Sequence, residues 1–391
     1  MKFNQKNFFH YIAFLSYFIN LFVCIFFFVL FLRPKKNNIY LTGHKLIGNL
    51  EILFNNQKTD KNNIYFITIN LRDYFILKKK YNNTQYSSNI KTFHNPIDAF
   101  NFLTAKAIVA SHGLFFNKIY IKYLKIKTIY CGHAIDGVYP VKVKKYFKHL
   151  KNFSEVWMYS SYELNMYVND FKYPYKNLKS IGYPRVHYLF ENKKNKNKLK
   201  ENLKINKKII LYAPTASRGS LNYLKSDLRL YNIKTLKILE KFLEKNNSIF
   251  IIKLHLNDKL SDEEKNYINQ SQHIFEQGSF MVKFDYDLLI MSDILITDYS
   301  TIYIDFLILD KPILFVRPPN PNLSWKYTFI VNNEFIDRID SLQALLSSIN
   351  MLINTKHTQK KLLEIKKSVF KDLKIEKILD SSYKSLEKYL Y

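Results

Sequence analysis

The chain has 391 residues, of which 47% are hydrophobic and 16% aromatic, and this composition excludes an intrinsically disordered protein. Its formal net charge of +28 comes with abundant Asn, Ile, Tyr and Phe and with few Arg, as an AT-rich coding sequence produces, so we expect no nucleic-acid partner. The two cysteines, Cys24 and Cys131, exclude a disulfide framework and a site of several thiolates, and they suit a reducing compartment.

A long uncharged stretch lies near the start of the chain. Tyr11–Leu32 consists mainly of Phe, Leu, Ile and Val, and it is long enough for a helix to cross a bilayer, which takes ~20 residues. The flanking Arg33-Pro34-Lys35-Lys36 offers no signal-peptide cleavage site. The stretch therefore predicts one N-terminal transmembrane helix, an uncleaved anchor over residues 1–36, with a buried core helix as the alternative.

Residues 37–190 alternate short apolar runs with helical patterns, which predicts a first α/β domain with a parallel sheet. The expected strands are rich in β-branched and aromatic residues and are too short for helices. They are Ile64–Ile69, Ala107–Ala110, Thr128–Cys131 and Val156–Tyr159. The expected helices between them are Asp98–Lys106 and Tyr162–Phe171.

Residues 191–208 are rich in Lys and Asn and can bury little, which predicts a basic linker that grades into a surface helix. Residues 209–340 predict a second α/β domain. Its expected strands are Ile209–Ala213, Ile249–Leu256, Ile294–Thr297 and Pro312–Val316, with a helix at Ile233–Glu244. Residues 341–391 show apolar positions at helical spacing, which predicts amphipathic helices on a flank of the domains.

The segment Met291–Arg317 contains the strongest indication of a site. Two apolar runs typical of buried strands flank one helix, and Asp298, Ser300 and Thr301 lie where that helix begins. Their oxygens can cap the helix, whose free N–H groups point outward from the carboxyl edge of the sheet. Ligands bind at this edge in open α/β sheets, although simple capping is the alternative for these residues.

The order of residues in this segment resembles a known signature. Ser292-Asp293-Ile294-Leu295-Ile296-Thr297-Asp298-Tyr299-Ser300-Thr301 is followed by Asp305-Phe306 and Asp310-Lys311-Pro312-Ile313. The block resembles the signature of the CDP-glycerol glycerophosphotransferase family, which includes the teichoic-acid primases and polymerases. The resemblance implies two Rossmann-like domains in a GT-B-like arrangement and places Asp298, Ser300 and Thr301 at the phosphates of a nucleotide donor.

Two further blocks of the second domain resemble the donor side of this family. Leu211-Tyr212-Ala213-Pro214-Thr215-Ala216-Ser217-Arg218 resembles its Leu-Tyr-Ala-Pro-Thr block, so Thr215, Ser217 and Arg218 are expected to contact the donor. Lys253-Leu254-His255 resembles its Lys-Leu-His-Pro block, with Leu256 in place of Pro. Lys253 and His255 are therefore predicted to neutralise the pyrophosphate or to protonate the departing CMP.

The first domain contains two candidates for the catalytic histidine. Cys131-Gly132-His133-Ala134 resembles the family's His-Gly block, with Ala134 in place of Gly and with Lys142 following at about the family spacing. His133 is therefore the predicted catalytic base, and Asp136 could orient it or cap a helix. A literal His-Gly pair occurs earlier at His112, which remains the rival.

Ile181-Gly182-Tyr183-Pro184-Arg185 resembles the family's Gly-Tyr-Pro-Arg turn, and it adds Arg185 to the predicted donor contacts. The chain has no P-loop, no Gly-x-Gly-x-x-Gly fingerprint and no His-Glu-x-x-His pair, and eight glycines are too few for glycine-rich phosphate cradles. Asp285-Tyr286-Asp287 is interpreted as the polar start of a helix. We therefore expect no required cofactor and no metal ligand, with Mg²⁺ on this pair as the alternative.

These residues predict a transferase that moves glycerol phosphate, or another alditol phosphate, from a CDP-linked donor to a hydroxyl of a polyprenol-linked or cell-surface glycan acceptor. Teichoic-acid and capsule synthesis are both open as pathways. The sequence places the protein at the cell membrane with its domains on the cytoplasmic side, where nucleotide donors are found. A GT-B nucleotide-sugar glycosyltransferase and a basic module that binds polyanions are the alternatives.

Overall fold

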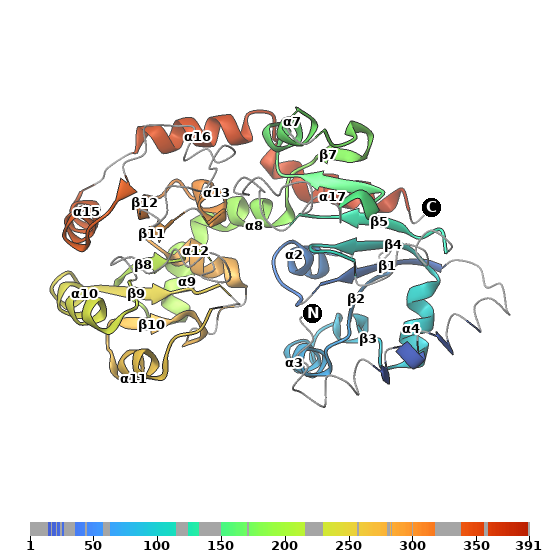
Figure 1. Cartoon of the computed structure of the whole chain (residues 1–391), viewed down its shortest axis with the longest axis horizontal. Coiled ribbons are helices and arrows are strands. Elements are labelled where there is room, and N and C mark those ends of the chain that lie inside the picture. The colour runs from blue at the N-terminus through green and yellow to red at the C-terminus, as the bar shows by residue number, and fades with distance from the viewer. Residues whose placement is uncertain are drawn as a thin grey trace. The chain divides into compact units, whose positions relative to one another are not determined.

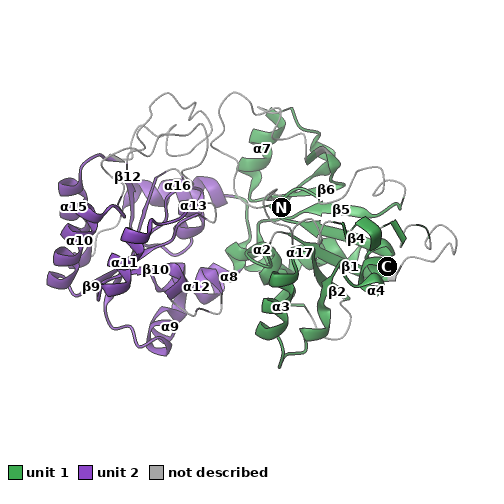
Figure 2. Ribbon diagram, turned by 60° about the horizontal axis from the view of Figure 1, so that its bottom comes forward, with its two compact units in different colours: residues 1–133, 144–187, 372–391 green, residues 134–143, 188–371 purple. Residues whose placement is uncertain are grey.

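The computed structural model describes residues 15, 16, 18–20, 22, 23, 26, 36–43, 45–57, 63–114, 124–132, 150–169, 172–215, 230–255, 258–279, 282, 284–298, 300–316, 338–355 and 359–389. The chain divides into two compact units (Figures 1 and 2). Unit 1 comprises residues 1–133, 144–187 and 372–391, and unit 2 comprises residues 134–143 and 188–371. Each unit contains a parallel sheet with helices around it, as the sequence predicts.

The sheet of unit 1 has the strand order β3-β2-β1-β4-β5-β6-β7. Its strands are β1 (Lys36–Thr42), β2 (Ile64–Thr68), β3 (Ile90–Thr92), β4 (Ala105–Ala110), β5 (Lys127–Tyr130), β6 (Glu155–Met158) and β7 (Leu178–Ser180). Its helices are α2 (Asn49–Asn55), α3 (Leu71–Lys80), α4 (Pro96–Leu103), α7 (Ser161–Asn169) and α17 (Ile378–Glu387). Helix α8 (Pro184–Asn192) begins in unit 1 and ends in unit 2.

The sheet of unit 2 has the strand order β10-β9-β8-β11-β12-β13. Its strands are β8 (Lys208–Tyr212), β9 (Ser248–Ile252), β10 (Ile274–Glu276), β11 (Ile294–Thr297), β12 (Ile313–Val316) and β13 (Arg338–Ile339). Its helices are α9 (Lys196–Asn202), α10 (Ile233–Lys245), α11 (Asp262–Gln270), α12 (Asp285–Met291), α13 (Ile302–Leu307), α15 (Leu342–Asn354) and α16 (Lys360–Phe370).

Alternate strand residues build the core of unit 2, because successive side chains of a strand point to opposite faces. Ile210, Ile252 and Ile296 face one side of the sheet and are wholly buried there. Leucines at helical spacing on α10 and α15 pack against them. The sequence predicts this amphipathic pattern for α15.

The predicted transmembrane helix over residues 1–36 is wrong. Among the residues that the structure describes, no helix is both long and apolar enough to cross a membrane, and within the run these residues are 15, 16, 18–20, 22, 23 and 26. Two polar residues of the run bond to the segment that follows β3: the Asn20 amide donates to the carbonyl oxygens of Phe93 and His94 at 3.3 and 3.2 Å, and Ser16 Oγ lies 3.2 Å from His94 Nδ1. The rest of the run lies outside the described residues.

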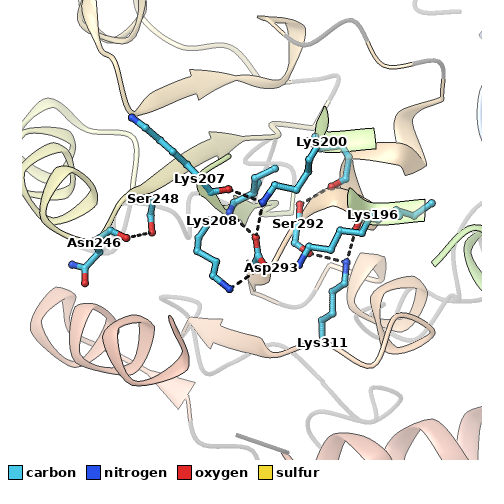
Figure 3. A network of polar contacts seen from close by, with 12 residues as sticks. Lys196, Lys200, Lys207, Lys208, Asn246, Ser248, Ser292, Asp293 and Lys311 are labelled. Atoms are coloured by element: carbon cyan, nitrogen blue, oxygen red, sulfur yellow. Dashed lines mark hydrogen bonds and ion pairs between the residues drawn. The ribbon is translucent and has the colours of Figure 1, made fainter. Parts of the chain in front are cut away.

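The segment predicted as a basic linker is largely helical. It continues α8 through a 3₁₀ turn at Lys193–Asn195 into α9, and β8 begins at Lys208. Figure 3 shows the contacts of these lysines: Lys196 and Lys200 form ion pairs with the Asp293 carboxylate, at 2.5 and 3.6 Å. The same carboxylate accepts a hydrogen bond from the backbone N–H of Ile209 at 2.9 Å. The basic segment therefore has an acidic partner directly before β11 that its own composition does not reveal.

The C-terminal helices are shared between the units. Helices α15 and α16 belong to unit 2, whereas α17 belongs to unit 1. In unit 1 the Tyr383 hydroxyl donates to the carbonyl oxygen of Leu53 at 2.6 Å, and Lys388 forms an ion pair with Glu155. Burial alone would raise the pKa of Glu155, but the hydrogen bonds from Lys388, Ser385 and Trp157 outweigh burial and lower it.

Candidate functional site

The carboxyl edge of the unit 2 sheet gathers most of the predicted donor residues. From β8 the chain runs outward through β9 and β10 on one side, and β11, β12 and β13 lie on the other side. The strand order therefore reverses between β8 and β11, and open α/β sheets bind ligands at such a switch point. Thr215 follows β8, Lys253 and His255 follow β9, and the segment from Asp298 to Thr301 follows β11.

Asp298 joins the two loops at this switch point. Its carboxylate accepts hydrogen bonds from the Thr215 N–H at 3.0 Å and from the Thr215 hydroxyl at 2.7 Å. Its Oδ1 also accepts from the Ser300 N–H at 2.9 Å. Asp298 is only 5% exposed, so these bonds satisfy a carboxylate that would otherwise be costly to bury. Thr297 adds a bond from its hydroxyl to the carbonyl oxygen of Ala213, at 2.7 Å.

The start of α13 differs from the expected capping. The helix begins at Ile302, Thr301 is its N-cap residue, and no side chain caps it. Asp298 instead binds the Ser300 N–H, which precedes the helix, together with the loop after β8. Among the described residues the hydroxyls of Ser300 and Thr301 make no hydrogen bond, and both residues are partly exposed. These two hydroxyls can therefore serve a ligand at the edge of the sheet.

Lys253 and His255 supply the basic groups of this edge. The Lys253 N–H donates to the carbonyl oxygen of Tyr212 at 2.8 Å, which aligns the end of β9 with the end of β8. Burial lowers the pKa of Lys253, and the charge of Asp285 partly offsets this effect. An anionic ligand would restore the charged form, because an opposite charge nearby favours it. His255 is exposed.

The pair Asp285 and Asp287 begins α12, as the sequence predicts. The Asp287 carboxylate accepts from the Tyr188 hydroxyl at 2.5 Å and from the Phe284 N–H at 3.1 Å. These contacts make Asp287 part of the helix start and of the packing of unit 2. Within the described ranges, no three His, Cys, Asp or Glu side chains are grouped as metal ligands.

The carboxyl edge of the unit 1 sheet holds one of the two candidate histidines, His112. His112 follows β4, and its Nδ1 lies 2.9 Å from Ser111 Oγ. Cys131 and Gly132 follow the neighbouring strand β5, and His133 is the next residue of the chain. Parallel neighbouring strands end at one edge, so His112 and the Cys131–Gly132 turn belong to the same edge. The predicted residues His133, Asp136, Lys142, Ser217 and Arg218 lie outside the described residues.

Arg185 belongs to unit 1, at the start of α8, and not to unit 2 with the other described donor candidates. Its guanidinium lies 4.8 Å from the ring centre of Tyr183 and 5.9 Å from that of Tyr159. The residue is 3% exposed. This burial against aromatic faces gives Arg185 a role in the packing of unit 1.

Asn49 is a buried residue of unit 1 that the sequence analysis missed. Its amide nitrogen donates to the carbonyl oxygens of Cys131 and Gly132, at 2.8 and 3.0 Å. Its amide oxygen accepts from the backbone N–H of Arg185 at 3.2 Å. These partners lie more than 80 residues away along the chain, so no local pattern marks Asn49. The one local signal is its place at the first turn of α2, directly after Gly48.

Two α/β units, each with a parallel sheet, and polar and basic groups collected at the switch point of one sheet place the chain among the open α/β proteins, in which ligands bind at the carboxyl edges of the strands. The profile of the family described as "CDP-Glycerol:Poly(glycerophosphate) glycerophosphotransferase" matches residues 25–370. The chain belongs to this family.

Several relatives of this chain carry names from teichoic-acid synthesis. The teichoic acid poly(glycerol phosphate) polymerase of Bacillus spizizenii is 37% identical over 148 residues, which are 35% of this chain and 34% of the relative. The teichoic acid ribitol-phosphate polymerase TarL of Staphylococcus aureus is 24% identical over 317 residues, which are 73% of this chain and 51% of the relative. The chain thus spans about half, or less, of the length of these relatives.

A solved structure of the wall teichoic acid polymerase TagF has a similar fold. The TM-score is 0.67 at 15% identity, and the match covers 91% of this chain and 90% of the TagF chain. At this identity the likeness concerns the fold alone. It extends over both α/β units, so the fold match does not depend on one common sheet motif.

Proposed function

We propose that the protein transfers glycerol phosphate, or a closely related alditol phosphate, from a CDP-linked donor to a hydroxyl of a glycan acceptor and releases CMP. The family match over residues 25–370 carries this proposal. The switch point of unit 2 supports it, since Lys253, Ser300 and Thr301 offer a diphosphate one ammonium group and two hydroxyls at one sheet edge. The named relatives act in teichoic-acid synthesis, which is the pathway we propose for this chain.

In the proposed reaction an acceptor hydroxyl attacks the β-phosphorus of the donor. A new P–O bond forms to the acceptor, and the P–O bond between the β-phosphorus and the oxygen that leaves with CMP breaks. His133 accepts the proton of the attacking hydroxyl. Lys253 and His255 stabilise the negative charge that grows on the departing CMP. Charged groups that are already in position and partly shielded from water stabilise such a charge most effectively.

Asp298 takes a different part in this proposal from the other donor residues. Its carboxylate is already used by Thr215 and Ser300, and a second negative charge beside the donor phosphates would be repelled. We therefore assign Asp298 to positioning: it holds the loop after β8 and the loop after β11 at the distance that the donor requires. Thr215 contributes through the same contact.

The donor requirement also suggests the place and the partners of the reaction. Nucleotide-linked donors are cytoplasmic, so we propose the cytoplasmic side of the cell membrane as the place of the reaction. A polyprenol-linked or other glycan acceptor, of wall teichoic acid or of a capsule, is the proposed partner. No metal is required in this proposal, because a lysine, a histidine and hydroxyl groups supply the charge stabilisation.

The test follows CMP and UDP release by the full chain with CDP-glycerol, CDP-ribitol and a panel of UDP-sugars. We expect CMP from a CDP-alditol and a loss of at least about 100-fold in turnover for His133→Ala and for His255→Ala, the scale of a lost acid–base group. His112→Ala tests the rival histidine. His273→Ala is the matched control, because His273 pairs with Glu240 at 3.1 Å near the amino end of β10. UDP release without CMP would refute phosphotransfer and indicate a glycosyltransferase.

A further inference from the structure

The turn that follows β5 is held from two sides. Gly132 has a positive φ of 76°, and a Cβ atom added there would lie 2.1 Å from Tyr183 Cζ. The Tyr183 ring therefore packs directly against the backbone of Gly132. The Tyr183 hydroxyl donates to both oxygens of Glu163 at 3.2 Å, and Glu163 in turn accepts from the Tyr159 N–H at 2.5 Å. One face of the turn thus rests on a fixed aromatic ring.

Asn49 holds the turn through its carbonyl groups. Both carbonyl oxygens of the turn, of Cys131 and Gly132, accept hydrogen bonds from the single Asn49 amide. The oxygen of the same amide binds the N–H of Arg185, one of the first-turn groups of α8 that have no partner inside the helix. Asn49 is 2% exposed, so all of these bonds form away from solvent. A buried amide in this state is strongly constrained in position, because each unmade bond is costly.

We propose that Asn49 is a positioning residue: its carboxamide fixes the Cys131–Gly132 turn, after which the chain continues to the proposed base His133. The inference rests on the proposed function insofar as His133 is the base of that reaction. It goes beyond the family resemblance, because none of the blocks that carry that resemblance includes a residue of α2. A displacement of about 1 Å at a reacting group is enough to cost 100-fold in rate.

The experiment uses the full chain in a Cys24→Ser background, so that Cys131 is the single thiol. Cys131 is wholly buried, and burial raises the pKa of its thiol to about 12, with the charge of Arg185 opposing this. Its rate of alkylation by iodoacetamide therefore reports opening of the turn. Asn55→Ala is the matched control, because Asn55 lies in the same helix and its amide donates to the Glu51 carbonyl and to the Tyr81 hydroxyl at 2.8 and 3.0 Å.

For Asn49→Ala we expect alkylation of Cys131 at least tenfold faster than in Asn55→Ala. We expect kcat for CMP release to fall about 10- to 100-fold and the KM for CDP-glycerol to stay within about twofold, because the proposed donor groups lie in unit 2. Asn49→Ser, whose hydroxyl donates one bond, should be intermediate in both measurements. This serine variant keeps the test available if the alanine variant does not fold.

Two results would overturn the proposal. An alkylation rate equal to that of Asn55→Ala would show that Asn49 does not hold the turn. Faster alkylation with an unchanged kcat would show that the turn does not position the catalytic group. If the wild-type protein releases no CMP from a CDP-alditol, the proposed function fails, while the alkylation rates still decide whether Asn49 holds the turn.

Discussion

Lys311 is a buried lysine whose protonation should make the stability of the protein depend on pH. Its ammonium group donates to the carbonyl oxygens of Ile290 and Ser292, the latter at 2.8 Å. Burial is the largest cause that lowers its pKa; with the charges of Lys196 and Lys200, and against the opposing charge of Asp293, the pKa falls to about 7 (Figure 3). In the unfolded chain the pKa is that of an ordinary lysine, 10.5.

Between about pH 7 and pH 10.5 the unfolded chain therefore binds more protons at this position than the folded chain does. Stability contributed by this site rises with pH across that window, and below about pH 7 the full cost of the buried charge is present. Each pH unit inside the window adds up to about 1.4 kcal/mol. Lys311 is still protonated in about half of the folded molecules near pH 7, which reduces the slope there. We therefore expect the free energy of unfolding to rise by about 2 kcal/mol from pH 7 to pH 9.

The assay compares wild type with Lys311→Met, which keeps the length of the side chain but cannot titrate. The difference in the free energy of unfolding, from urea titrations at pH 7, 8 and 9, should shift by this amount in favour of the wild type. Lys237→Met is the matched control, because Lys237 is an exposed lysine on α10 of the same unit. If the difference in the free energy of unfolding between wild type and Lys311→Met stays constant between pH 7 and pH 9, the reasoning that Lys311 is partly neutral in the folded protein is refuted.

Two further substitutions test the two sheet edges. Gly132→Ala places a methyl group 2.1 Å from Tyr183 Cζ at a positive φ, so we expect a loss of more than about 2 kcal/mol in the free energy of unfolding. Gly113 has open space around it, so Gly113→Ala should change the free energy of unfolding by less than about 0.5 kcal/mol. Equal effects of the two would contradict the described packing. Thr215→Val removes the hydroxyl that donates to Asp298 at 2.7 Å, so we expect a loss of about 1–3 kcal/mol and a higher donor KM. An unchanged urea midpoint together with an unchanged KM would show that the hydrogen bond between Thr215 and Asp298 contributes neither to stability nor to donor binding.

Much of the secondary structure follows from local patterns, but strand β1 of unit 1 does not. β2, β4 and β11 are short apolar runs, and the sequence predicts all of them. β1 lies between β2 and β4 and was missed, because it begins with the polar residues Lys36 and Asn37 and has only a short apolar run. Its place in the sheet comes from pairing on both sides, with Leu41 opposite Phe66 and Val109.

The boundaries of α4 show that helical periodicity does not predict where a helix begins and ends. The sequence predicts a helix over Asp98–Lys106, whereas α4 covers Pro96–Leu103. The Asn95 side chain caps this helix by accepting from the N–H groups of Ile97 and Asp98, and Pro96 occupies the first turn. The residues after the helix start β4 at Ala105, where pairing with β1 takes over from helical hydrogen bonding.

Local sequence patterns are enough to predict the two α/β sheets and the position of Thr215, Lys253 and Ser300 at one edge, because parallel strands place their carboxyl ends together and a residue that follows a strand lies there. The partners of the buried polar groups were decided only by the tertiary structure. Asp298 binds Thr215, 83 positions away, and Asn49 binds Cys131, 82 positions away. Such contacts depend on how strands and helices pack in space, and the local spacing of residues along the chain does not predict that packing.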